Sequence, residues 1–219
     1  MKATRISEHI WSLKIWLLIP IHVWIIVDKD GVTLIDAGIS TMAKPIMNFI
    51  RKLDAGPLQS ILLTHGHSDH TGSINKLLSK TKVPVYAHQK EIPYMAGNLP
   101  YPRRKKAVKT VAKDVVQPLG TNTDGSLKQI AGLTPYLTPG HSPGHVAYYH
   151  ELDQVLLAGD LFTSKKGKLR KPMAMFTADM DEAIRSSAIV EQLNPIMLEV
   201  CHGNTVYDPA SQMKAYLSS

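Results

Sequence analysis

The sequence lacks the cysteines that a disulfide framework requires. Cys201 is the single cysteine among 219 residues, and one thiol cannot form an internal disulfide bond. This excludes the class of small secreted domains that disulfides hold together. It also fits a reducing compartment, so we expect a cytoplasmic location.

The sequence also lacks an apolar run long enough to cross a membrane. Its most apolar window, residues 15–27, contains Pro20 and His22 and is shorter than the roughly 20 apolar residues of a spanning helix. The first residues show no apolar signal-peptide core followed by a small-residue cleavage site. We therefore interpret the window as buried strands and expect no association with a membrane.

What the sequence does contain is typical of one globular domain. Hydrophobic residues make up 44% and charged residues 20% of the chain, which excludes general disorder and provides enough apolar surface for a core. The length is that of one domain, so we expect residues 1–219 to form a single domain.

A net charge of +7 favours anionic partners, either a small anionic substrate or a nucleic acid. Much of the excess lies in two basic clusters, residues 103–109 and residues 165–171. Such runs are either solvated surface or part of an anion-binding site, and the sequence leaves both interpretations open.

Alternation of apolar segments with turn residues predicts a similar order of elements in both halves of the chain. In the first half we expect strands at 10–19, 21–27, 32–35, 60–63 and 83–87, with helices at 41–53 and about 70–80. In the second half we expect strands at 127–131, 133–138, 146–150, 154–158 and 196–200, with helices at 179–193 and 209–217. The order predicts an α/β protein with two mixed sheets sandwiched between helices, a four-layer αββα arrangement. Residues 93–106 and 164–176 are the expected long loops.

The densest group of chemically active residues follows the strand expected at 60–63. Here the segment His65-Gly66-His67-Ser68-Asp69-His70 places three histidines and one aspartate within six positions. Imidazole and carboxylate are ligands that zinc and similar divalent metals prefer. His65 and His67 can point toward one ion, and Asp69 and His70 are displaced enough to reach a second. The motif therefore predicts a metal centre.

Two open metal sites need more ligands than one motif supplies. Candidates stand at the ends of apolar strands later in the chain: His141 in a Pro-Gly loop, Asp160 after Leu156–Gly159, and His202 after Ile196–Val200. Polar groups at strand ends also cap turns, so each candidate alone has two interpretations. Together they predict that four segments converge on the metal centre.

These residues, in this order, resemble the metallo-β-lactamase superfamily. The resemblance covers nearly the whole chain and rests on LIDAG (34–38), THGHSDHTG (64–72), TPGHSPGHV (138–146), AGDLF (158–162) and Cys201-His202-Gly203. It implies the four-layer αββα fold and a dinuclear centre.

Carried over by position, the resemblance assigns His65, His67 and His141 to one metal ion, Asp69, His70 and His202 to the other, and Asp160 to both. Asp36 resembles the aspartate that orients a ligand histidine, although it also fits a turn cap after a strand. His145 matches a position that does not bind metal. The cofactors implied are two divalent ions, with Zn²⁺ favoured and iron or manganese as alternatives.

Such a pair of ions would generate hydroxide from a shared water, and Asp69 or one of the ions would assist the leaving group. The sequence therefore predicts a metallo-hydrolase acting on an ester, thioester or lactone of a small anionic substrate. Cys201 is interpreted as packing rather than as a nucleophile. We expect the two long loops to flank the substrate with cations and aromatic side chains, among them Tyr94, Tyr101 and Phe162. A homo-oligomer is compatible with the sequence.

Other members of the family remain as alternatives. The resemblance disfavours a true zinc β-lactamase, which lacks the bridging aspartate. This chain ends soon after His202, where glyoxalase II has a further helical domain, and it has Thr163 where quorum-quenching lactonases carry a tyrosine. An RNase Z-like phosphodiesterase would need an inserted tRNA-binding arm, so nucleic acid is disfavoured. An iron-dependent dioxygenase of the persulfide dioxygenase type, and a binding protein with a vestigial site, stay as competing hypotheses.

Overall fold

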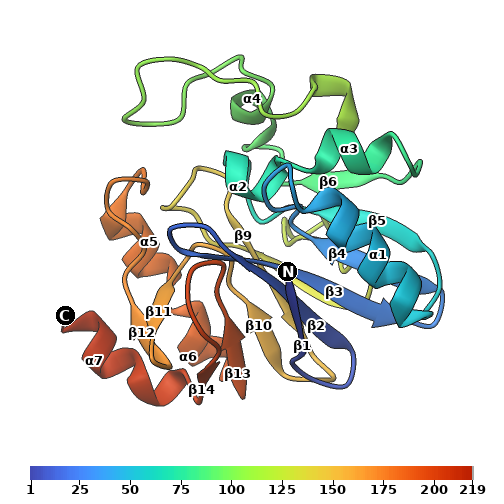
Figure 1. Ribbon diagram of the computed structural model, residues 1–219. Coiled ribbons are helices and arrows are strands. Elements are labelled where there is room, and N and C mark those ends of the chain that lie inside the picture. The colour runs from blue at the N-terminus through green and yellow to red at the C-terminus, as the bar shows by residue number, and fades with distance from the viewer. Residues whose placement is uncertain (219) are drawn as a thin grey trace. The chain divides into compact units, whose positions relative to one another are not determined.

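The computed structural model describes residues 1–218 (Figure 1). Its contacts divide the chain into two units, Met1–Leu119 and Gly120–Ser219. Each unit contains one mixed β-sheet with its own helices. The predicted α/β class and the two mixed sheets are therefore confirmed, whereas the single domain over 1–219 stays a prediction.

The sheet of the first unit has the strand order β1-β2-β3-β4-β5-β6-β7. Its strands are β1 (Lys2–Arg5), β2 (Ile10–Trp16), β3 (Pro20–Asp28), β4 (Gly31–Ile35), β5 (Leu58–Leu62), β6 (Val85–Ala87) and β7 (Val116–Pro118). Strands β1 to β4 pair antiparallel, and β4 to β7 pair parallel. Most of β3 and all of β4 are buried on both faces, which explains why these segments are apolar runs rather than alternating patterns.

The helices of this unit are α1 (Ala43–Leu53), α2 (Ser68–Thr71), α3 (Ile74–Leu78), α4 (Ile92–Met95) and the 3₁₀ turn η1 (Lys113–Val115). Helix α1 buries Ala43, Ile46 and Ile50, which lie on one face because they are spaced by three and four residues. It ends at Asp54, whose φ of 52° is left-handed. The single helix expected at about 70–80 is instead two short helices, α2 and α3.

The sheet of the second unit has the order β14-β13-β10-β9-β8. Its strands are β8 (Leu133–Leu137), β9 (Val146–His150), β10 (Val155–Leu157), β13 (Met197–Glu199) and β14 (Val206–Tyr207). The β10 and β13 pair is parallel, and the other pairs are antiparallel. A separate hairpin is formed by β11 (Thr163–Lys165) and β12 (Lys168–Arg170).

One face of this sheet is covered by helices. The helical elements of the unit are α5 (Met180–Ser186), α6 (Ile189–Leu193), the 3₁₀ turn η2 (Ala210–Gln212) and α7 (Met213–Leu217). Leu156 and Leu198 of the sheet share one buried cluster with Val190 of α6 and with Met213 and Tyr216 of α7. This cluster fixes the strand ends of the unit, where the polar candidates stand.

Several sequence-based predictions of elements were wrong. The strand expected at 127–131 is absent, and isolated bridges at Leu127 and Ile130 stand in its place. The backbone at Ala131 and Gly132 has φ of 51° and 72°, which no strand tolerates. The helix expected at 179–193 is interrupted near Ser187, whose hydroxyl donates to the Ile184 carbonyl and competes with continued helix.

The window 15–27 was expected to form buried strands, but residues 16–19 are exposed at the turn between β2 and β3. Other differences are short elements that the patterns did not predict. Strands β1, β7 and β14 were not expected, α4 overlaps the loop expected at 93–106, and all but the first residue of the β11–β12 hairpin lies within the loop expected at 164–176. The hairpin is rich in lysine and has no apolar alternation, so the sequence pattern had no strand signal there. Within residues 1–218, no helix combines the length and the apolar character that a membrane span requires.

Candidate metal centre

The first cluster consists of His65, His67, Asp69 and His70, in the segment that joins β5 to α2. His65 and His70 are completely buried, and His67 and Asp69 are half-buried. The Nε2 atom of His65 lies 3.0 Å from Nδ1 of His67, and Nε2 of His70 lies 3.8 Å from an Asp69 carboxylate oxygen. The rings of His65 and His70 are 4.0 Å apart, centroid to centroid. The motif thus folds into one compact set of donor atoms.

Asp36, just after β4, supports this cluster through hydrogen bonds. It is completely buried. One of its carboxylate oxygens accepts the Thr64 backbone N–H at 2.8 Å, and the other lies 2.7 Å from His70 Nδ1. Since His70 Nδ1 donates to a carboxylate, its Nε2 atom carries the lone pair that a metal requires. Asp36 therefore both fixes the turn and orients His70.

Thr64 lies beside both His65 and His70, the first and last residues of the motif. The sequence analysis did not identify Thr64. Its hydroxyl donates to Asp36 at 2.8 Å and lies 3.1 Å from His65 Nδ1. Because its proton is directed to Asp36, the hydroxyl accepts from His65 Nδ1–H, which leaves a lone pair on His65 Nε2. A threonine beside a histidine carries no signal of this role in the sequence.

The second cluster consists of His141, Asp160 and His202, all nearly completely buried. The Nε2 atoms of His141 and His202 each lie 3.3 Å from the same oxygen of Asp160, Oδ2. His141 follows β8, Asp160 follows β10 and His202 follows β13. Three strands of one sheet thus deliver three potential ligands to one point.

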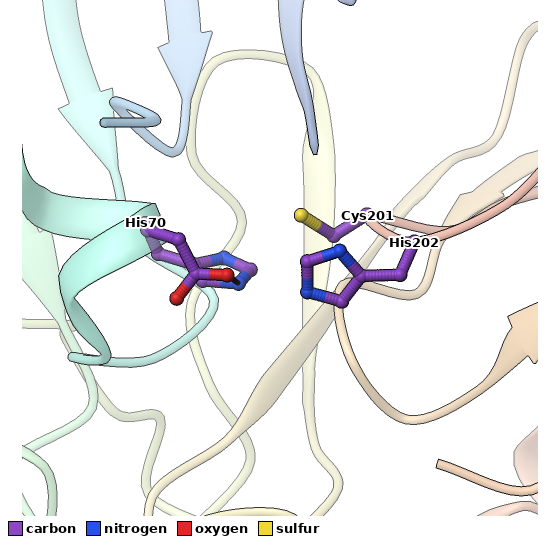
Figure 2. A group of neighbouring side chains, drawn as sticks. His70, Cys201 and His202 are labelled. Carbon is purple, nitrogen blue, oxygen red and sulfur yellow. Dashed lines mark ion pairs between the residues drawn. The ribbon is translucent and has the colours of Figure 1, made fainter. Parts of the chain in front are cut away.

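Figure 2 shows His202 beside Cys201, on the segment after β13, and His70 on α2. The Cys201 sulfur is within 4.8 Å of an imidazole nitrogen of His202. Cys201 is completely buried, and its backbone N–H donates to the Gly159 carbonyl at 2.9 Å. This bond joins the segment of His202 to the segment that ends in Asp160.

Supporting hydrogen bonds also orient the second cluster. The Thr177 hydroxyl donates to the Met173 carbonyl at 3.0 Å and lies 3.3 Å from His141 Nδ1, so it accepts from that nitrogen and leaves the lone pair on Nε2. His145 lies 3.1 Å from the Asp160 backbone N–H and accepts it through Nε2. Its Nδ1 lies 2.8 Å from the Thr138 hydroxyl. His145 thus contacts the Asp160 backbone with one nitrogen and the Thr138 hydroxyl with the other.

The donor spacing within each cluster fits a bound metal. Two donors at about 2.0–2.1 Å from one tetrahedral zinc ion lie about 3.3 Å apart. The pairs His141–Asp160 and His202–Asp160 are at 3.3 Å, and His65–His67 is at 3.0 Å. Imidazole and carboxylate donors also match zinc, iron and manganese. The residues present therefore fit divalent metal ions.

Beside the first cluster, a group of aromatic and acidic side chains surrounds His67. The Tyr101 ring lies edge-on to the His67 ring, 4.7 Å away between centroids, and stacks on Tyr94 at 5.0 Å. The Tyr101 hydroxyl donates to Glu91 at 2.6 Å. Burial, followed by the nearby Glu91 charge, raises the pKa of Tyr101 well above its usual value of 10.0, so this hydroxyl stays protonated and donates.

One aromatic expectation was wrong. Phe162, expected beside the substrate, is completely buried and packs against Tyr216, with ring centroids 5.1 Å apart. It belongs to the apolar cluster of the second unit and cannot contact a substrate there. Leu161 and Phe162 lie between β10 and β11, after a turn at Gly159, and their apolar side chains are buried rather than exposed on a loop.

Comparison with known proteins places this chain in a family. The sequence model of the metallo-beta-lactamase superfamily matches residues 17–217. The probable metallo-hydrolase YybB of Bacillus subtilis (strain 168) is 40% identical over 99% of this chain and 98% of its own length. A hydroxyacylglutathione hydrolase of Pseudomonas fluorescens (strain SBW25) is 29% identical, over 72% of this chain and 54% of its own length.

Solved structures agree on the fold. A metallo-beta-lactamase from Pontibacter korlensis superposes with a TM-score of 0.75 over 99% of this chain and 97% of that chain, at 20% identity. At this identity the likeness establishes the fold and nothing of the substrate. The family match over almost the whole chain, the 40% identical metallo-hydrolase and the shared fold lead to one conclusion: this chain belongs to the metallo-beta-lactamase superfamily.

Proposed function

We propose that the two clusters together hold two divalent metal ions and that the protein hydrolyses an ester, thioester or lactone of a small anionic substrate. The observation that carries this proposal is the position of Asp160 Oδ2, at 3.3 Å from the Nε2 atoms of both His141 and His202. A carboxylate oxygen this close to two imidazole nitrogens lies where a ligand shared between two metal ions would lie. The proposal assigns His65, His67 and His141 to one ion and Asp69, His70 and His202 to the other.

The chain's own residues have distinct roles in this reaction. Divalent ions held there would supply Lewis acidity and lower the pKa of water toward neutrality. Asp36 and Thr177 keep the Nε2 lone pairs of His70 and His141 available, and His145 fixes the Asp160 backbone. The Asp69 side chain is 30% exposed, whereas Asp36 is 0% exposed. Asp69 can therefore exchange protons with the attacking water and the leaving group, and is the proposed catalytic acid and base.

The substrate class rests on the relatives and on charge. Hydroxyacylglutathione hydrolases are among the relatives of this chain, at about a third identity or less, so a thioester is the first substrate to test. The exposed cations of the two basic clusters include Arg103 and Arg104, close to Tyr101 in the sequence, and Lys165 and Lys166 at the tip of the β11–β12 hairpin. Cations near a reaction centre raise the local concentration of an anionic substrate.

The test is a substrate panel combined with metal analysis. Protein purified without added metal is assayed for metal content and screened against thioesters, lactones, β-lactams, phosphodiesters and persulfides. We expect about two ions per chain and hydrolysis of a thioester, ester or lactone that a chelator abolishes. Asp160→Ala should lose at least one ion and the activity, while the control Asp124→Ala, at an exposed carboxylate, should keep both.

The other outcomes identify the competing functions. Oxygen consumption with a persulfide and bound iron would indicate a dioxygenase, and phosphodiester cleavage would indicate an RNase Z-like enzyme. Full metal occupancy without any activity would indicate a binding protein. Each of these results contradicts the proposed hydrolase.

A further inference from the structure

Gly66, between His65 and His67, is held by side chains on both sides of its backbone. Its N–H donates to the Glu91 carboxylate at 3.1 Å, and its carbonyl accepts the Thr110 hydroxyl at 3.1 Å. Both partners come from outside the motif, 25 and 44 residues along the chain. The peptide groups before and after Gly66 are planar, so these two bonds fix the orientation of both peptide planes.

The Glu91 carboxylate is itself held in place. Glu91 is completely buried at the start of α4, and the same oxygen that accepts Gly66 N–H also accepts the Tyr101 hydroxyl at 2.6 Å. Tyr101 in turn packs its ring on His67. One buried carboxylate oxygen thus connects the backbone of the histidine motif to a side chain that contacts one of its histidines.

The side chains around Gly66 leave no space for a Cβ atom at this position. A Cβ atom at position 66 would collide with the Met95 side chain and with the Tyr101 hydroxyl oxygen. Gly66 has no left-handed φ, so the requirement for glycine comes from neighbouring atoms and not from backbone conformation. The residues that restrict this position belong to α4 and to the segment that follows it.

We propose that Glu91, Tyr101 and Thr110 are positioning residues that clamp Gly66 and thereby set the spacing of His65 and His67 for a metal ion. The inference rests on the proposed metal-binding role of these histidines. The peptide plane between His65 and Gly66 and the plane between Gly66 and His67 are both held by the clamp. Each plane adjoins the Cα atom of one histidine, so the clamp controls the 3.0 Å separation of the two ring nitrogens. A site whose ligands are held in advance binds metal more tightly, because less freedom is lost on binding.

The test uses Co²⁺ as the probe and does not depend on enzymatic activity. Glu91→Ala, Tyr101→Phe and Thr110→Val are compared with the wild type for Co²⁺ dissociation constant and for the visible absorption bands of bound Co²⁺. Removing a partner that orients ligands weakens metal binding about 10–100-fold. We expect the Co²⁺ dissociation constant to rise about tenfold for Glu91→Ala and by a smaller factor for each hydroxyl removal, with altered band positions.

The control is Tyr86→Phe, which removes the hydroxyl of another half-buried tyrosine in the same unit, on β6. It should bind Co²⁺ as the wild type does. If Glu91→Ala does not fold, Tyr101→Phe and Thr110→Val decide the question.

The proposal is overturned if the folded variants lose thermal stability without metal but keep the wild-type Co²⁺ affinity and spectrum, because the group would then be structural only. That result would leave the proposed hydrolase intact. Conversely, the wild type could hydrolyse none of the substrates while the variants bind Co²⁺ more weakly than the wild type. That result would support the clamp and refute the proposed hydrolase. A wild type that binds no Co²⁺ would contradict both.

Discussion

Replacing Asp36 by Asn should separate the stability of the first cluster from its metal affinity. The two side chains have nearly the same shape, and asparagine tolerates left-handed backbone, which position 36 requires with its φ of 58°. The Thr64 backbone N–H can only donate, so it keeps the oxygen of the new amide in the place of Oδ1. The amide NH₂ then replaces Oδ2 and faces His70 Nδ1.

This exchange inverts the hydrogen bond to His70. An NH₂ group donates, so His70 must accept through Nδ1 and move its own proton to Nε2, where it blocks the metal. We expect metal binding to weaken about 10–100-fold. The metal-free protein loses charge-assisted bonds worth about 1.5–3 kcal/mol each, but the amide and the rotated Thr64 hydroxyl restore part of them. We therefore expect the free energy of unfolding to fall by about 1–3 kcal/mol.

The assay has two parts: urea unfolding of the metal-free protein and chelator competition for the metal affinity. Asp54→Asn is the matched control, since Asp54 is exposed and also has a left-handed φ of 52°. It should change neither quantity by more than about 0.5 kcal/mol. Wild-type metal affinity in a folded Asp36→Asn protein would refute the orienting role of Asp36.

Further predictions concern packing, metal removal and charge. Gly66→Ala should lower the free energy of unfolding by about 1–3 kcal/mol through overpacking. The control Gly120→Ala should change it little, because the new Cβ atom would meet only the flexible Lys128 side chain. Equal effects of the two substitutions in thermal or urea unfolding would contradict the close packing at Gly66. Chelation should lower the melting temperature by roughly 10–20 °C, since two ions, each at 100 times its dissociation constant, together add about 5.4 kcal/mol, and calorimetry before and after adding metal back checks this. Changing Arg103, Arg104, Lys165 and Lys166 to Ala should raise KM for charged substrates and spare neutral analogues; steady-state kinetics showing unchanged KM would remove the anionic-substrate idea.

Much of the fold could be predicted from the sequence because its central strands are apolar runs bounded by turn residues. Strands β3 and β4 were expected at nearly their observed bounds, and the Asp28–Gly31 turn between them is visible in the sequence. The β11–β12 hairpin and β7 could not be predicted, since short polar strands depend on neighbours that a local pattern does not contain. The interruption at Ser187 depends on a hydroxyl that competes with the helix, which composition alone does not show.

The residues of the candidate site were likewise predictable only in part. Histidine and aspartate at strand ends are conspicuous, so each proposed ligand could be named before the structure, and the structure gathers them into two clusters, one in each unit. The residues that orient them were harder to predict. Thr64 and Thr177 are common residues whose role is defined by the direction of one hydroxyl proton, and Glu91 reaches the motif from 25 residues away.

Anomalous diffraction from crystals grown with zinc would locate the proposed metal ions among these side chains. We expect two peaks about 3.5–4 Å apart, one beside His65, His67 and His141 and the other beside Asp69, His70 and His202, with Asp160 touching both. A single peak at another place, or side chains of these residues pointing away from two well-occupied ions, would contradict this expectation.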